Sequence, residues 1–237
     1  FMTAALVEME KNPQIQSMLS KGGRSDNFSS YQAESSGASQ SDNPNVQSHQ
    51  KSGDFFDDFE QGPNPNWKPI IGDWTMANGK YTVSSITGET MYLTFLQNHQ
   101  WDNLTMEADI ISGDCRFQNT HIYIGPRVVN GEDGVYLVAK SEGKGKINSF
   151  AWVTKKEGKW GQYVGEVHKE FHNRKKIHVK IVVRNGVYNA FADGLKITQF
   201  YSNKSKTGSV GLGLWYEDWS SPRQRSLIDN VRVNKLK

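Results

Sequence analysis

Two acidic residues in the stretch MEADIISG are the first candidates for chemistry. Glu107 and Asp109 stand two positions apart in a run that alternates polar and apolar residues, so both lie on one face of a β-strand. Two carboxylates can act as general acid and general base in glycoside hydrolysis. Polar residues on a solvent-facing strand give the same pattern, and we favour a non-catalytic protein over an enzyme.

Aromatic residues beside charged ones in two loop-like stretches, WGQYVGE and WYEDWSSPRQR, form a second group of candidates. Aromatic rings pack on the C–H face of a sugar, while charged groups bind its hydroxyls. The predicted binding residues are Trp160, Tyr163, Tyr216, Asp218, Trp219 and Arg223, with Arg127 of IYIGPR as an addition. The alternatives are that these rings cap the ends of the fold, or that they form a protein interface.

Histidine and cysteine offer little further chemistry. His168 and His172 have the spacing of a zinc pair on a helix, but the region reads as a turn and lacks a suitably placed Glu. His121 alternates with Tyr123 in THIYIG, so the two can share a binding surface, although most histidines are ordinary surface residues. The single cysteine, Cys115, allows no disulfide within the chain.

The bulk composition narrows the partners. The net charge of +3 over 237 residues, with Lys and Arg scattered, argues against nucleic acid. No apolar stretch approaches the roughly 18 residues that a membrane span needs. No signal peptide is visible, and the chain begins with Phe1. We expect an extracellular or cell-surface protein; an organelle protein that has lost a transit peptide is the alternative.

The chain divides into three predicted zones. Residues 1–21 carry apolar residues at helical spacing and are predicted to be a helical docking segment that needs a partner to be stable. Residues 22–53 are rich in Ser and Gly and are predicted to be a flexible linker. Residues 54–237 are predicted to be a β domain.

The β domain is predicted from ten or more short alternating runs, such as MYLTFL, IHVKIVV and SVGLGLWY. Asn-Gly and Asp-Gly pairs separate several of them, and Asn185-Gly186 between two strands is the clearest hairpin. So many strands in about 180 residues predict an all-β, two-sheet antiparallel jelly-roll sandwich.

The order of motifs in this zone resembles a known family. DDFEQGPNPNWKPIIGDWTMANGKYTVSS, then IYIGPR, DGVYLVAK, TGSVGLGLW and IDNVRV, look like the concanavalin A-like, laminin-G-like jelly roll of carbohydrate-binding modules and sugar-processing enzymes. The resemblance covers residues 54–237. Laminarinase-type enzymes of this fold carry the motif E-x-D-x-x-E, of which MEADIISG lacks the last acid.

The resemblance also implies a metal site. In many such jelly rolls the first and last strands lie side by side, and acids from both hold a structural calcium ion, which prefers oxygen ligands. The matching positions here are Asp58, Glu60 and Asp229, and Asp57 is a candidate for an additional ligand. The alternative is that Asp229 binds a neighbouring backbone amide.

The N-terminal zone has a shorter resemblance. NPQIQSMLSKG, within residues 6–22, is similar to the helical repeats of hop-type co-chaperones and ubiquilins, which would imply a protein partner for residues 2–21. A chance amphipathic helix explains the same residues.

Three hypotheses follow. The first is a non-catalytic, lectin-like module that binds a glycan or polysaccharide and is tethered by the N-terminal helix and linker. The second is an accessory subunit that uses the jelly roll and the helix to dock onto a larger protein assembly. The third is a glycoside hydrolase-like enzyme.

Overall fold

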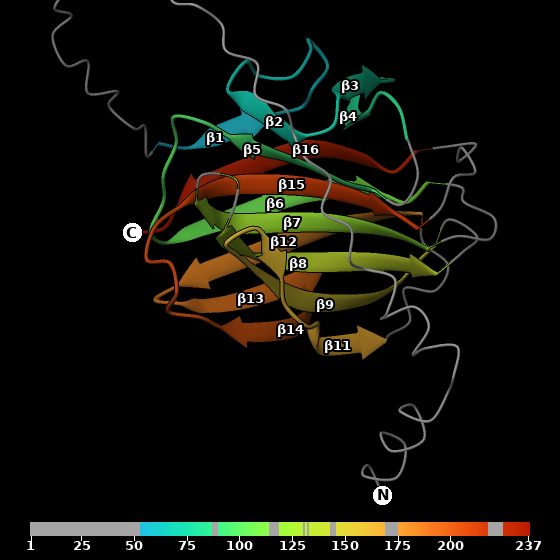
Figure 1. Ribbon diagram of the computed structural model, residues 1–237. Coiled ribbons are helices and arrows are strands. Elements are labelled where there is room, and N and C mark those ends of the chain that lie inside the picture. Colours follow the sequence, from blue (N-terminus) through green and yellow to red (C-terminus); the bar gives the residue numbers. More distant parts are fainter. Residues whose placement is uncertain are drawn as a thin grey trace, which may run out of the picture. The chain divides into compact units, whose positions relative to one another are not determined.

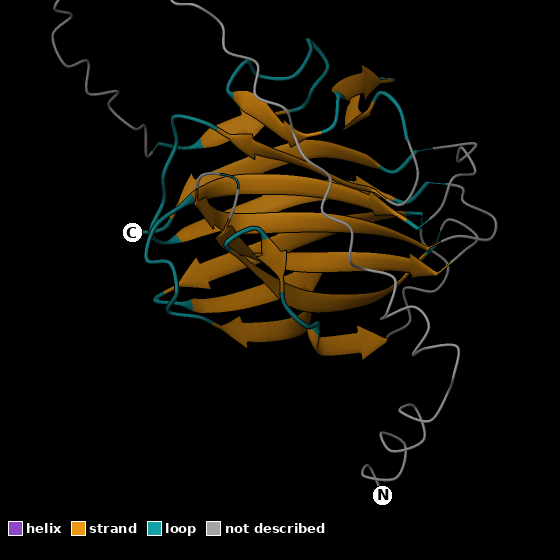
Figure 2. Cartoon of the chain, in the orientation of Figure 1, coloured by secondary structure: helices purple, strands orange, loops and turns teal. Residues whose placement is uncertain are grey.

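The computed structural model describes residues 53–86, 90–113, 119–129, 131, 133–142, 146–168, 175–217 and 225–237. The predicted helical segment and all but the last residue of the predicted linker lie outside these ranges. The described part consists of strands and loops (Figure 2). Within it, no helix has the length and apolar character to cross a membrane.

The strands form two antiparallel sheets that stack face to face (Figure 1). The first sheet has the order β14-β13-β12-β6-β16-β4-β3, with β1 also paired to β16. Its strands are β1 (Phe55–Asp57), β3 (Trp74–Ala77), β4 (Lys80–Val83), β6 (Leu104–Ile111), β12 (Lys176–Arg184), β13 (Val187–Ala192), β14 (Leu195–Tyr201) and β16 (Leu227–Lys235).

The second sheet has the order β10-β9-β8-β7-β15-β5-β2, with β11 also paired to β9. Its strands are β2 (Trp67–Ile71), β5 (Thr90–Leu96), β7 (Asn119–Val129), β8 (Asp133–Glu142), β9 (Ile147–Lys156), β10 (Lys159–Trp160), β11 (Val164–His168) and β15 (Ser209–Tyr216). The two-sheet antiparallel sandwich confirms the fold class predicted from the alternating runs.

The core lies between the sheets and follows the two-residue period of the sequence. In β12, Ile177, Val179, Ile181 and Val183 are buried, while the residues between them are exposed or half-buried. Every strand that alternates in this way turns one apolar row inward. Trp152 and Tyr81 are almost completely buried there.

Tight turns connect neighbouring strands of the first sheet. Asn185 and Gly186 have φ values of 50° and 80° and join β12 to β13. A two-residue turn with two positive φ values matches the twist of a hairpin, which is why Asn-Gly is favoured. Asn78-Gly79 and Asp193-Gly194 have the same geometry. Asp133-Gly134 does not form a turn, because these residues already belong to β8.

The first and last strands lie side by side, as the resemblance implies. Phe55 is paired with Val233 and Asp57 with Val231. The opposite edge of β16 is paired with β6. The final strand therefore lies inside the first sheet, between β1 and β6, which are both distant from it in the sequence.

Candidate functional site

An aromatic groove lies on the outer face of the second sheet. It has a cavity volume of about 470 Å³. Its lining residues are Met91, His121, Tyr123, Val153, Trp160, Gly161, Tyr163 and Trp215. We call this feature the aromatic groove.

The strand register places one wall of the aromatic groove. Trp215 on β15 is paired with Met91 on β5 and with His121 on β7, so these three side chains form a row across three strands. The imidazole of His121 stacks on the indole of Trp215, with a centroid separation of 4.6 Å and an interplanar angle of 30°. Tyr123, two residues further along β7, lies on the same face.

The chain between β9 and β11 supplies the other wall. Glu157 and Gly158 turn the chain with φ values of 51° and 75°, and β10 pairs back on β9. Trp160 then packs against Tyr123 and Tyr136, at centroid separations of 5.1 Å each. Tyr163 follows in the segment that leads into β11, and its side chain is accessible because the residue is 41% exposed.

A small hydrogen-bond network joins the two walls. The hydroxyls of Tyr123 and Tyr163 are 2.9 Å apart, and the Tyr163 hydroxyl is 3.3 Å from Nδ1 of His121. Burial, together with the nearby Lys140 ammonium, lowers the pKa of His121 to about 4, so its imidazole is neutral at physiological pH. Burial raises the pKa of Tyr123, so its phenol also stays neutral.

An ion pair supports Tyr163 from beside the aromatic groove. The Lys140 ammonium lies 4.0 Å from the Tyr163 ring centroid and 2.8 Å from the carboxylate of Glu166. The same carboxylate oxygen accepts a hydrogen bond of 2.9 Å from Ser149. Burial alone would raise the pKa of Glu166, but the hydrogen bonds from Lys140 and Ser149 outweigh it and lower the pKa. Glu166 is therefore ionised and neutralises Lys140.

The structure brings together two of the predicted binding residues, Trp160 and Tyr163, in the aromatic groove. Tyr216 lies elsewhere: it is 1% exposed, faces the core, and accepts a hydrogen bond from the backbone of Ser226. Arg127 is also buried, and it donates to the carbonyl oxygens of Ser205 and Asp102. The other predicted members, Asp218, Trp219 and Arg223, lie outside the described residues.

Sequence reasoning missed Trp215 and Met91 as groove residues. The sequence SVGLGLWY does carry the relevant pattern: Leu212, Leu214 and Tyr216 point inward, which leaves Trp215 on the outer face. What the sequence does not show is that β5 and β7 flank β15. That order decides which side chains meet across the sheet.

Glu107 and Asp109 lie on the outer face of the first sheet, whereas the aromatic groove lies on the second. The Glu107 carboxylate is 2.9 Å from the Lys180 ammonium. Asp109 contacts Lys176 and His178, each at 2.8 Å. Burial disfavours the charged form of Asp109, but its hydrogen bonds to these partners outweigh burial and lower the pKa. Both carboxylates thus belong to ion pairs that lie on the other sheet from the aromatic groove.

Two of the three acids of the predicted calcium site, Asp229 and Asp58, have partners within the chain. One oxygen of Asp229 accepts a hydrogen bond from the Asn230 backbone, and the other lies 2.7 Å from the Lys80 ammonium. Asp58 accepts a hydrogen bond from the backbone of Glu60. Nowhere in the described ranges do three or more His, Cys, Asp or Glu side chains group as metal ligands. Lys80 thus already contacts one of the three predicted ligands, and the calcium site stays a prediction.

A β-bulge explains why Asp229 interrupts an apolar strand. The pairing of β16 with β6 shifts between Asp229 and Arg232, and Asn230 has a φ of 51°. The bulge lets Ile228 and Val231 both face the core, although they are three positions apart in the strand. Asp229 is left on the outer face, where Lys80 pairs with it.

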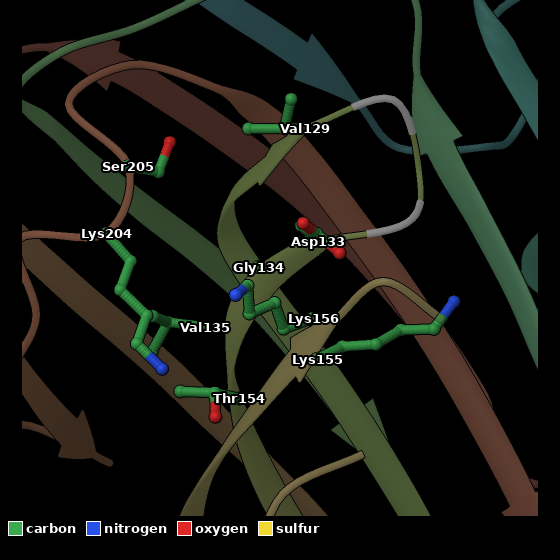
Figure 3. Close-up of a pocket in the computed structure, with 9 residues that line it drawn as sticks. All are labelled: Val129, Asp133, Gly134, Val135, Thr154, Lys155, Lys156, Lys204 and Ser205. Atoms are coloured by element: carbon green, nitrogen blue, oxygen red, sulfur yellow. The ribbon is translucent and has the colours of Figure 1, made fainter. Parts of the chain in front are cut away.

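A second hollow, of about 360 Å³, lies at the end of the sandwich where β7 leads into β8 (Figure 3). Its lining includes three lysines, Lys155, Lys156 and Lys204. In Figure 3 the side chains of Lys155 and Lys204 extend in different directions. The Lys156 ammonium lies 3.2 Å from the carboxylate of Glu157, and Asp133 also lines the hollow, so its positive charge is partly compensated.

Comparisons with known proteins identify the fold. No protein-family model matches the sequence, and no curated protein matches it. Among solved structures, the carbohydrate-binding module CBM66 from Bacillus subtilis matches with a TM-score of 0.58 and 15% identity, over 72% of this chain and 96% of the module. A Bacillus licheniformis β-glucanase matches with a TM-score of 0.56 and 11% identity, over 79% of this chain and all of the enzyme. The Emp47p carbohydrate recognition domain matches with a TM-score of 0.55 and 12% identity, over 81% of this chain and 97% of that domain.

The chain shares the fold of these proteins. The match confirms the concanavalin A-like jelly roll that the order of sequence motifs indicates. At identities of 11% to 15% the similarity establishes the fold alone. The three names include a binding module, a recognition domain and an enzyme, so this fold serves proteins with and without catalysis.

Proposed function

We propose that this protein is a carbohydrate-binding, lectin-like jelly-roll module, and that the aromatic groove is its glycan site. The observation that carries the proposal is the joint presence of aromatic rings and neutral hydrogen-bonding groups in one accessible groove. Trp160, Trp215 and Tyr163 offer rings for the C–H faces of sugars, and Tyr123 and His121 add polar atoms. Two matched proteins of the same fold are named as carbohydrate-binding or carbohydrate-recognition domains, which supports the proposal.

Glycan binding fits the aromatic groove better than glycoside hydrolysis does. Hydrolysis requires two carboxyl groups on either side of the scissile bond in most such enzymes. Within the described part of the chain, the aromatic groove is lined by no Asp or Glu. Its ordered rings instead suit retention of an unreacted sugar chain.

A glycan array followed by titration of each hit tests the proposal. We expect Trp160→Ala to weaken the affinity for hits by at least about tenfold, or about 1.4 kcal/mol, because the sugar loses a stacking surface. Tyr163→Phe is a second variant, which keeps the ring and removes only the hydroxyl. It tests the aromatic groove even if Trp160→Ala disturbs folding.

Phe56→Ala is the matched control. Phe56 is 48% exposed and lies on β1, in the first sheet, where it contacts Arg232. It is therefore an accessible aromatic residue outside the aromatic groove, and its loss should leave binding unchanged. Unchanged affinity in both groove variants, with their folds intact by circular dichroism, would rule out the aromatic groove as the glycan site.

A further inference from the structure

In the described part of the chain, the charged groups beside the aromatic groove are paired with one another and not presented to a ligand. None of the described residues that line it is Asp, Glu, Lys or Arg. His121, the one titratable base in the lining, is held in its neutral form by burial and by Lys140. Every described polar group in the lining is therefore uncharged near neutral pH.

The ion pair beside the aromatic groove consists of Lys140 and Glu166, whose charges neutralise each other. Lys140 is 9% exposed, and its ammonium lies between the Tyr163 ring and the Glu166 carboxylate. Lys155 lies 5.8 Å from the centroid of the Trp160 ring, but it is 5% exposed and lines the separate hollow in Figure 3. Neither lysine presents a free ammonium to a sugar in the aromatic groove.

We infer that the aromatic groove selects uncharged glycans over acidic or amino sugars, and that Glu166 sets this selectivity by neutralising Lys140. This inference rests on the proposed glycan function. A sugar carboxylate that enters the groove loses hydration and finds no free cation. An amino sugar likewise finds no free carboxylate among the described residues that line the aromatic groove. A neutral sugar pays neither cost, because its hydroxyls exchange hydrogen bonds with Tyr163, Tyr123 and His121.

Glu166→Gln is the informative variant. The amide keeps the shape of the side chain and removes its charge, so the Lys140 ammonium loses its counter-ion next to the aromatic groove. We expect the affinity for carboxylated glycans to rise by about fivefold, as one partly exposed charge pair can provide. The affinity for the neutral glycan should change little.

Glu107→Gln is the matched control. Glu107 pairs with Lys180 at 2.9 Å on the outer face of the first sheet. This substitution changes the net charge of the protein by the same amount, but the freed lysine lies away from the aromatic groove. A general effect of net charge would appear in both variants, whereas the effect that we infer appears only in Glu166→Gln.

The experiment is an array that carries each polysaccharide backbone in neutral, carboxylated and amino forms, with titration of the hits. We expect neutral forms to bind wild type about tenfold or more tighter than charged forms of the same backbone. We also expect Glu166→Gln, and not Glu107→Gln, to reduce the difference in affinity between the neutral and the carboxylated form of the same backbone.

Two results would overturn the inference in different ways. If charged forms bind as tightly as neutral ones, and Trp160→Ala abolishes that binding, the inference is wrong while the proposed function stands. If no form of any backbone binds the folded wild-type protein, the proposed function fails and the inference fails with it.

Discussion

The half-buried histidine of the aromatic groove makes stability depend on pH in a defined direction. The pKa of His121 is lowered from its ordinary value of 6.5 to about 4. Between these values the unfolded chain binds a proton that the folded chain rejects, so the free energy of unfolding falls as the pH falls through this range. This lowering of the His121 pKa changes the free energy of unfolding by roughly 3 kcal/mol, at about 1.4 kcal/mol per pH unit.

Replacing His121 with Gln removes this titration and keeps a polar side chain. Urea unfolding of the wild type and of His121→Gln, followed at pH values from 7.5 to 4, measures the difference between them. We expect the wild type to lose about 3 kcal/mol more than the variant over this interval. Parallel pH profiles would show that His121 titrates normally, and hence that it is not buried against Trp215 and Lys140 as described.

Three further predictions concern the scaffold. Gly186→Ala should cost about 2 kcal/mol of stability, because φ is +80° and a Cβ would lie 2.8 Å from the carbonyl oxygen of Ser202. Gly194→Ala should cost less, because φ is +82° but no atom lies within 4 Å of the added Cβ. Equal losses of stability in thermal melts would show that the contact with Ser202 does not contribute. Lys80→Met should cost about 2 kcal/mol in urea unfolding, because it leaves the buried Asp229 carboxylate without its cation; no change would mean that this pair is not formed. Calcium addition or chelation should leave Tm unchanged, because Lys80 already contacts Asp229. A calcium-dependent rise in Tm that Asp58→Asn abolishes would contradict this expectation and support the predicted metal site.

The strands and most turns of the fold are local features, and the sequence reports them well. The run IHVKIVV alternates because one face of β12 is buried, and Asn185-Gly186 is the pair that a two-residue hairpin turn favours. The Glu157-Gly158 turn, which carries Trp160 to the aromatic groove, lacks such a strong preference and was not predicted.

The candidate site depends on pairings between distant segments, which alternation alone does not specify. The Gly-rich segment around Trp160 and Tyr163 indicates a binding loop, but the other side chains that line the aromatic groove come from four separate strands. Trp215 looks like one more apolar residue until β7 and β5 are known to flank β15. The sequence predicts its neighbour Tyr216 as a binding residue, but Tyr216 faces the core because adjacent strand residues point to opposite sides.

The role of an acid in a strand is equally hard to read locally. The family resemblance matches Asp229 to a calcium ligand, and the alternative is a hydrogen bond to a neighbouring backbone amide, which Asn230 donates. The partner in the structure is Lys80, which is 149 residues away in the sequence. The bulge at Asn230 gives the acid its place on the outer face, and no short motif announces that bulge.

The central claim is that the aromatic groove binds glycans. The most direct measurement is the affinity of the wild-type protein and of Trp160→Ala for the tightest hit of a glycan array, with Phe56→Ala titrated in parallel. The account predicts that the wild type and Phe56→Ala bind equally and that Trp160→Ala binds at least about tenfold more weakly. Equal affinity of all three folded proteins, or binding lost through Phe56 alone, would contradict it.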